Sequence, residues 1–442
     1  MTELKRTLGL PALVYYGVGT IVGAGIYSII GAAAGQAGEA LWVTFILAAV
    51  VATLSALSYA ELVSAVPRVG GEYAFLRRTF PDQQWVSFTG GFIVTIAGGA
   101  TAATVAIAFG GYLSLFVAIP NWISAIVLLG ACTFVNILGI RQSTWVNIVL
   151  TSIQVLGLTI VVVAGVSVGD ITKPLTATPK LSAITATALV FFVYTGFEAM
   201  VNFVEEAKEP TRDLPRSLLL AIAITAIIYL LVALSVVTLA EPAELGKSDS
   251  PLSYAAGQAH DSLSTALAWF ALCATATTAL ITCISMSRLL FGMARDGELP
   301  ASVAKLLPRR RTPWVGALII FVASVALLPA GGVETVASIA SLTTIAAFVG
   351  IHICLIKLRI TEPGLDRPFR VPWAIRGVPV LTVLGIVAAV ALATQFSWVV
   401  YAYSTASIVV GAVLYFAVVR PNTPEKPARS ETEADGTDEP RS

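Results

Sequence analysis

The chain has 442 residues, of which 57% are hydrophobic and only 12% are charged, and its formal net charge is +1. Soluble domains average roughly 25% charged residues, so composition excludes a globule in water. A nearly neutral chain also argues against a nucleic-acid partner.

The charges are clustered between apolar runs of roughly 20 residues or more, the length that a helix needs to cross hydrocarbon. Lipid offers the backbone no hydrogen bonds, so such runs must form helices or a closed barrel. Barrel strands would be about half as long and would alternate in polarity, which these runs do not. The sequence therefore predicts an all-α polytopic membrane protein embedded in a lipid bilayer.

Twelve apolar ranges are predicted to be membrane spans: 11–33, 39–66, 86–118, 121–139, 145–168, 181–204, 215–240, 262–290, 313–330, 333–357, 378–396 and 398–419. The last two are separated only at Ser397. Residues 1–10 form an N-terminal segment, and 67–85 is long enough for a short interfacial helix. The tail 420–442 has no apolar periodicity and is predicted to be disordered.

Basic residues predict the orientation of the spans in the membrane. With the N-terminus inside, the inside segments hold 24 of the 27 Lys and Arg residues, and the outside loops hold only Lys173, Lys180 and Lys247. Positively charged loops stay in the cytoplasm, so both termini are predicted to be cytoplasmic. From the compact loops we expect the inner or plasma membrane of a prokaryote.

Two of the predicted spans contain sequences that weaken a helix. The first has Gly17, Gly19, Gly23 and Gly25 within nine residues, and the sixth has Tyr194-Thr195-Gly196. Each glycine costs a helix about 1 kcal/mol relative to alanine. Spans one and six are equivalent positions of a five-plus-five inverted repeat, where paired interruptions indicate a transporter binding site. The alternative is close helix packing, for which Gly19 and Gly23 have the right spacing.

An interrupted membrane helix can bind a zwitterion. Free N–H groups at the start of a half-helix attract a carboxylate, and free carbonyls at the end of one attract an ammonium group. The chain has no HExxH, P-loop or GxSxG motif, and its two histidines, His260 and His352, are far apart. We therefore expect neither an enzyme nor a cofactor or metal site. A non-transporting amino acid sensor remains the alternative of another class.

Several stretches in order resemble the amino acid–polyamine–organocation (APC) family of permeases. They are Val22–Tyr27, Tyr59–Leu62, Gly70–Tyr73, Gly196–Glu198, Glu205–Pro210, Arg212–Arg216, Ser287–Leu290, Met293–Pro300 and Arg367–Pro372. The resemblance implies a LeuT-like five-plus-five inverted repeat with discontinuous spans one and six. Residues 11–168 and 181–357 would be the two repeats, and 378–419 two further helices.

The resemblance also implies roles for individual residues. The substrate carboxylate would bind at the first break, and the substrate ammonium group would bind carbonyls of the sixth span. Phe192 would be an aromatic gate over the substrate; the alternatives are that it packs inside the protein or faces lipid. The implied substrate-binding residues are Thr20, Ile21, Gly23, Ala24, Gly25, Phe192, Tyr194, Thr195 and Gly196.

The coupling ion is left open by the sequence. Glu198 is implied as a proton-coupling or gating group, although it could instead offset a half-helix dipole. Gln154 stands where some relatives carry a titratable lysine. Thr277 and Thr278 could help bind Na⁺ or could bond to backbone. Proton symport, sodium symport and exchange therefore all remain. Neutral amino acids are favoured, with cationic ones and polyamines not excluded.

One further acidic residue is expected to be structural. Glu61 lies near the cytoplasmic end of the second span. A carboxylate there is expected to pair with a nearby arginine or with backbone, because an unpaired charge at this depth is costly.

Overall fold

The computed structural model of the chain describes residues 6, 8–67, 70–139, 144–308 and 310–419. The first eight helices are α1 Leu10–Ile21, α2 Gly25–Ala37, α3 Leu41–Ala65, α4 Gly71–Thr79, α5 Gln84–Leu113, α6 Asn121–Leu138, α7 Thr144–Val168 and α8 Ser182–Val190. The next eight are α9 Pro210–Leu239, α10 Pro242–Leu245, α11 Pro251–Ala259, α12 Asp261–Arg295, α13 Trp314–Leu327, α14 Val333–Thr361, α15 Val380–Ala393 and α16 Trp398–Leu414.

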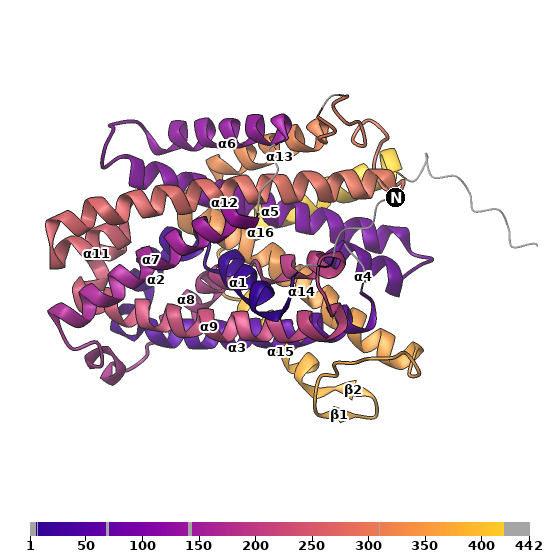
Figure 1. The fold of residues 1–442 in the computed structure, drawn as a ribbon, viewed down its shortest axis with the longest axis horizontal. Coiled ribbons are helices and arrows are strands. Elements are labelled where there is room, and N and C mark those ends of the chain that lie inside the picture. The colour runs from indigo at the N-terminus through magenta and orange to yellow at the C-terminus, as the bar shows by residue number, and fades with distance from the viewer. Residues whose placement is uncertain (1–5, 7, 68–69, 140–143, 309, 420–442) are drawn as a thin grey trace, which may run out of the picture.

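Short turns and one hairpin connect these helices. The 3₁₀ turns are η1 Gly38–Ala40, η2 Lys173–Thr176, η3 Phe191–Tyr194, η4 Phe197–Glu205 and η5 Leu328–Ala330, and the π turn η6 is Tyr415–Val419. The antiparallel strands β1 Ala374–Ile375 and β2 Val378–Pro379 form a hairpin. The long helices run along the long axis of the molecule, with α11 at one end and the hairpin projecting near the other (Figure 1).

Nine helical segments in the described part of the chain are long and apolar enough to cross a membrane, with Gly25–Ala65 counted as one. Three shorter apolar helices, Leu10–Ile21, Trp314–Ala330 and Val380–Ala393, accompany them. Large apolar side chains cover the outside of the bundle: Val127, Phe134 and Val322 are each more than 60% exposed. Such a surface fits lipid and not water, so the structure agrees with a polytopic membrane protein.

Each of the twelve predicted ranges contains helix, but several boundaries differ. Helix α9 begins at Pro210, five residues before the predicted span, because proline suits the first position of a helix. Helix α12 runs on to Arg295, beyond the predicted end at 290. The sequence did not predict the short helices α10 and α11. The expected interfacial helix in 67–85 is α4, whereas the tail 420–442 lies outside the described residues.

The two predicted interruptions are present. Helix α1 ends at Ile21 and α2 begins at Gly25, and the sixth range changes from α8 to η3 and then, across Thr195 and Gly196, to η4. Both broken segments pack inside the bundle, with α1 against α9 and α7 and α2 against α8. Backbone hydrogen bonds between Leu8 and the segment after η4 join the two at one end, because Leu8 N–H donates to Glu206 O and Lys208 N–H to Leu8 O.

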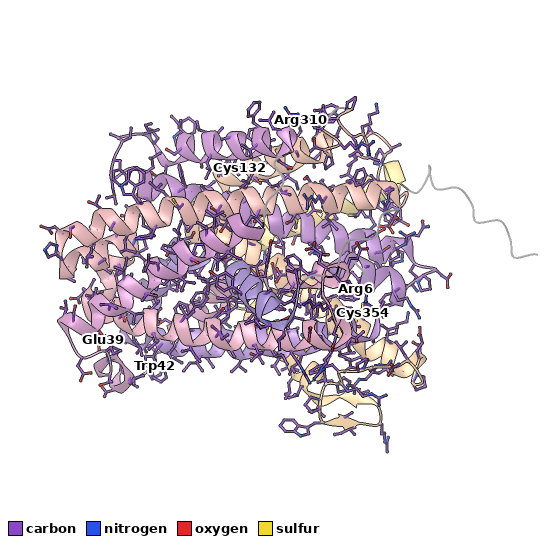
Figure 2. The ribbon with its side chains drawn as sticks, in the orientation of Figure 1. Arg6, Glu39, Trp42, Cys132, Arg310 and Cys354 are labelled. Carbon is purple, nitrogen blue, oxygen red and sulfur yellow. The ribbon has the colours of Figure 1, made fainter. Side chains whose placement is uncertain are left out.

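Charged side chains hold the hairpin end of the bundle together. Glu61 on α3 is fully buried and accepts hydrogen bonds from Arg359 Nε (2.7 Å), Arg359 Nη2 (2.5 Å) and the N–H of Val371 (2.7 Å). This confirms the expectation that Glu61 pairs with arginine and backbone. Arg78 on α4 makes two 2.8 Å hydrogen bonds with Glu362 after α14. Figure 2 shows Arg6 in this half of the molecule and Glu39 in the opposite half.

Candidate functional site

The break in the first span consists of Val22, Gly23 and Ala24. The backbone N–H of Ala24 donates to Thr278 Oγ1 on α12 at 2.9 Å. A Cβ at Gly23 would lie 2.9 Å from the same oxygen, so a larger residue would displace the Thr278 side chain. Thr20 turns its hydroxyl back onto its own helix, donating to Gly17 O at 2.9 Å. A hydrogen bond to Thr278 therefore holds the break against α12.

The break in the sixth span lies at Thr195 and Gly196. Thr195 is extended, and its N–H and hydroxyl both donate to Phe192 O, at 3.2 and 2.7 Å. Gly196 has φ +113°, a conformation that glycine adopts readily and L-residues rarely do. Its N–H donates to Glu198 Oε2 at 2.7 Å. The Glu198 carboxylate thus caps the start of η4, as in the alternative that it offsets the half-helix dipole.

The two breaks touch each other. A Cβ at Gly196 would lie 2.5 Å from the carbonyl oxygen of Thr20, and one at Gly25 would lie 3.2 Å from Val193 Cα. At Gly196 the backbone contact and the positive φ both require glycine, and at Gly25 the contact leaves little room for a side chain. The structure therefore brings the first group of predicted residues against the second, at the centre of the bundle.

Tyr229 on α9 connects the broken helices, a role that was not predicted from the sequence. Its buried hydroxyl lies 2.8 Å from Ile21 O, at the end of α1, and 3.2 Å from Val193 O, at the end of the other half-helix. A helix end leaves its last carbonyls without partners in the helix, and one hydroxyl serves both ends here. A lone tyrosine in an apolar range gives no sequence signal for such a role.

Two predicted aromatic residues differ in what they contact. Phe192 is 3% exposed, which rules out the lipid-facing alternative for its side chain. Tyr194 donates its hydroxyl to Phe45 O on α3 at 3.0 Å, so this side chain is anchored to the neighbouring helix. Phe192 is therefore part of the packed interior beside the break, and Tyr194 holds its half-helix against α3.

The residues predicted for coupling are not all at the breaks. Glu198 and Thr278 contact them directly, as described above. Thr277 donates to Cys273 O of its own helix at 2.7 Å. Gln154 is 4% exposed, its backbone oxygen accepts from the Tyr27 hydroxyl at 2.7 Å, and its Oε1 has no hydrogen-bond partner among the described residues. Of these four residues, Gln154 is the one whose side chain presents a buried acceptor without a hydrogen-bond partner in the described part of the chain.

A further polar cluster joins α4 to the segment after α12. Arg77 pairs with Asp296, and the Tyr73 hydroxyl donates to Asp296 Oδ2 at 3.1 Å. Ser87 donates to Glu298 Oε1 at 2.7 Å, and burial raises the pKa of the Glu298 carboxyl. The described residues contain no group of three His, Cys, Asp or Glu side chains that could hold a metal ion. Hydrogen bonds and an ion pair thus join α4 and α5 to the segment after α12.

Comparison with known proteins agrees with this architecture. The amino acid permease family profile matches residues 8–414. The branched-chain amino acid permease BcaP of Bacillus subtilis is 29% identical, over 95% of this chain and 94% of that protein. The methylthioribose transporter of Bacillus subtilis is 30% identical, with coverage of 95% and 94%. The vacuolar cationic amino acid transporter 4 of Arabidopsis thaliana is 31% identical, over 82% of this chain and 64% of that protein.

Family membership follows from the extent of these matches. The family profile covers nearly the whole described chain, and relatives from bacteria and a plant align over most of its length. The chain therefore belongs to the amino acid permease family of the APC superfamily, whose members are multi-pass membrane transporters and not enzymes.

Proposed function

We propose that the chain is a secondary active transporter that moves amino acids across the membrane by alternating access. The observation that carries the proposal is the contact between the two breaks, where Gly196 lies against the carbonyl oxygen of Thr20. Transporters with inverted repeats bind substrate at such interrupted helices, because the half-helix ends supply dipoles for both charges of a zwitterion. The five-plus-five repeat, with both termini in the cytoplasm, is part of this proposal.

The substrate carboxylate would bind the backbone around Gly23, Ala24 and Gly25, and the ammonium group the carbonyls of the sixth span. The existing hydrogen bonds set a condition on this arrangement. Ala24 N–H is held by Thr278, and Phe192 O by Thr195, so substrate must share or replace these bonds. Their exchange for bonds to substrate gives binding a direct way to alter the packing of α12 and η3.

We favour neutral amino acids as substrates and H⁺ as the coupling ion. Among the residues proposed for the site, Glu198 alone is acidic, and it is engaged by Gly196 N–H. A cationic side chain would therefore need to compete for that carboxylate. The relatives include a branched-chain amino acid permease and cationic amino acid transporters, so cationic substrates stay in the test. Sodium symport and exchange are the alternative modes, and Thr277, bonded to its own helix, gives sodium little support.

Uptake by purified protein in liposomes tests the proposal. Radiolabelled neutral and cationic amino acids, polyamines and methylthioribose would be offered under a proton gradient, under a sodium gradient, or with internal substrate alone. We expect concentrative uptake of a neutral amino acid under the proton gradient. Uptake that requires internal substrate would show an exchanger. Absence of any transport, together with stabilisation of the protein by an amino acid, would favour a sensor and contradict the proposal.

A further inference from the structure

Glu72 has a buried carboxyl group and is not among the residues of the proposed site. It lies in the first turn of α4, is 7% exposed, and accepts a 2.7 Å hydrogen bond from the hydroxyl of Tyr59 on α3. Among the described residues, no lysine or arginine forms an ion pair with it. A buried carboxylate without a cationic partner is costly, so the side chain gains from binding a proton.

The start of α4 is attached to η4, the half of the sixth span that follows the break. Gly70 N–H donates to Asn202 Oδ1 at 3.1 Å, and a Cβ at Gly71 would lie 3.6 Å from Val201 Cγ2. The Tyr59 ring packs edge-on against Phe197, with centroids 5.5 Å apart. Glu72 is therefore held beside the turn that carries Glu198.

Tyr59 lies between the two carboxyls, because its hydroxyl donates to Glu72 and its ring packs against Phe197, the neighbour of Glu198 in the chain. Two carboxylates placed in this way repel each other when both are charged. Glu198 is partly buried and is bound at the break by Gly196 N–H, and Glu72 is buried and is bound by Tyr59. When two carboxylates share a poorly solvated region, the state with one proton between them is favoured. Burial also raises the pKa of the Glu72 carboxyl, which favours its protonated form.

Other titratable groups near Glu72 do not provide a compensating charge. On α3 the neighbour is Tyr59, and on η4 it is Glu198. On α14, Cys354 is near Tyr59, while the Lys357 ammonium lies over the Phe80 ring at 3.8 Å. The remaining charged and titratable side chains of α4 pair elsewhere: Tyr73 and Arg77 with Asp296, and Arg78 with Glu362.

We propose that Glu72, positioned by Tyr59, forms with Glu198 a carboxyl pair that holds the coupling proton during transport. The pair binds one proton from water and carries one negative charge while α4 and η4 stay packed together. Separation of α4 from η4 at the hairpin end would bring Glu72 into contact with water, where the proton is released. The inference rests on the proposed transport function and adds a residue to its coupling. It also removes the need for a titratable group at Gln154.

The test compares two kinds of transport by the same reconstituted protein. Wild type, Glu72→Gln, Glu72→Asp and the control Glu205→Gln would be assayed for accumulation driven by a proton gradient and for substrate exchange at equal pH. Glu205 is a matched control because it lies at the end of η4 and is exposed. Proton entry would be followed with a pH-sensitive dye inside the liposomes.

We expect Glu72→Gln to lose gradient-driven accumulation and proton entry by at least about tenfold, because an amide cannot take up the proton that a carboxylate binds, while exchange persists. Glu72→Asp should restore part of the accumulation, and Glu205→Gln should behave as wild type. Wild-type accumulation by Glu72→Gln would overturn the inference and leave the transport function intact. Loss of exchange in a folded Glu72→Gln protein would also overturn the inference. So would accumulation by the wild-type protein that is driven by a Na⁺ gradient alone. Failure of wild type to transport any substrate would instead overturn the proposed function.

Discussion

Replacement of Gly196 by alanine should damage both the stability and the activity of this protein. The residue has φ +113°, and its new Cβ would lie 2.5 Å from Thr20 O and 3.1 Å from Thr20 C. Strained backbone of this kind costs on the order of 1–3 kcal/mol for a non-glycine residue. The clash cannot be relieved by rotating a side chain, because the atoms that it meets are backbone. The two breaks must therefore move apart, and we expect a total cost of at least about 2 kcal/mol.

The matched control for this variant is Gly292→Ala. Gly292 lies within α12, and a Cβ there would meet no atom within 4 Å. Alanine should be neutral or should stabilise the helix by up to about 1 kcal/mol. Thermal unfolding in detergent and amino acid uptake in liposomes would be measured for both. We expect lower unfolding temperature and impaired uptake for Gly196→Ala only. If that variant matched wild type in both assays, the contact between the breaks would not be as described.

Three other variants test separate parts of the structure. Tyr229→Phe leaves two buried carbonyls without their partner and should cost about 1–3 kcal/mol, seen as a lower unfolding temperature and weaker substrate binding; unchanged values would show that the hydroxyl is dispensable. Arg359→Gln should destabilise by about 1–3 kcal/mol, because the fully buried Glu61 carboxylate loses two hydrogen bonds and keeps only Arg367, at 3.4 Å, and the N–H of Val371; adding Glu61→Gln should recover part of the loss. Burial raises the pKa of Glu298 above its ordinary 4.5, so this group stabilises the folded state at low pH and loses that contribution as pH rises through the folded-state pKa. Glu298→Gln should therefore flatten the pH dependence of the unfolding temperature above about pH 4.5. An unchanged profile would contradict this reasoning.

The sequence predicted the features that depend on composition and on local backbone preference. Apolar length placed helix in all twelve ranges, clustered glycines located the first break, and Tyr194-Thr195-Gly196 located the second. Boundaries were less accurate where charged residues lie inside a helix, as at the start of α9, because hydropathy underestimates helices that extend beyond lipid. Short polar helices such as α10 and α11 were missed for the same reason.

The parts of the site that the sequence did not predict are contacts between distant segments. Tyr229 is 208 residues from Ile21 and 36 from Val193, the residues whose carbonyls it binds, and it looks like an ordinary residue of its own segment. Thr278 was identified, but its bond to Ala24 N–H depends on how α12 packs against the first break. Only the three-dimensional arrangement shows that this hydroxyl fastens the backbone.

The most direct test of the central claim is binding of radiolabelled amino acids to purified wild type, Gly25→Leu and Gly292→Leu. A Cβ at Gly25 already lies 3.2 Å from Val193 Cα, so leucine must intrude between the two breaks, whereas Gly292 has open space. The account predicts saturable binding to wild type and Gly292→Leu and loss of binding to a folded Gly25→Leu protein. Normal binding by folded Gly25→Leu would contradict the claim that the substrate binds where the broken helices meet.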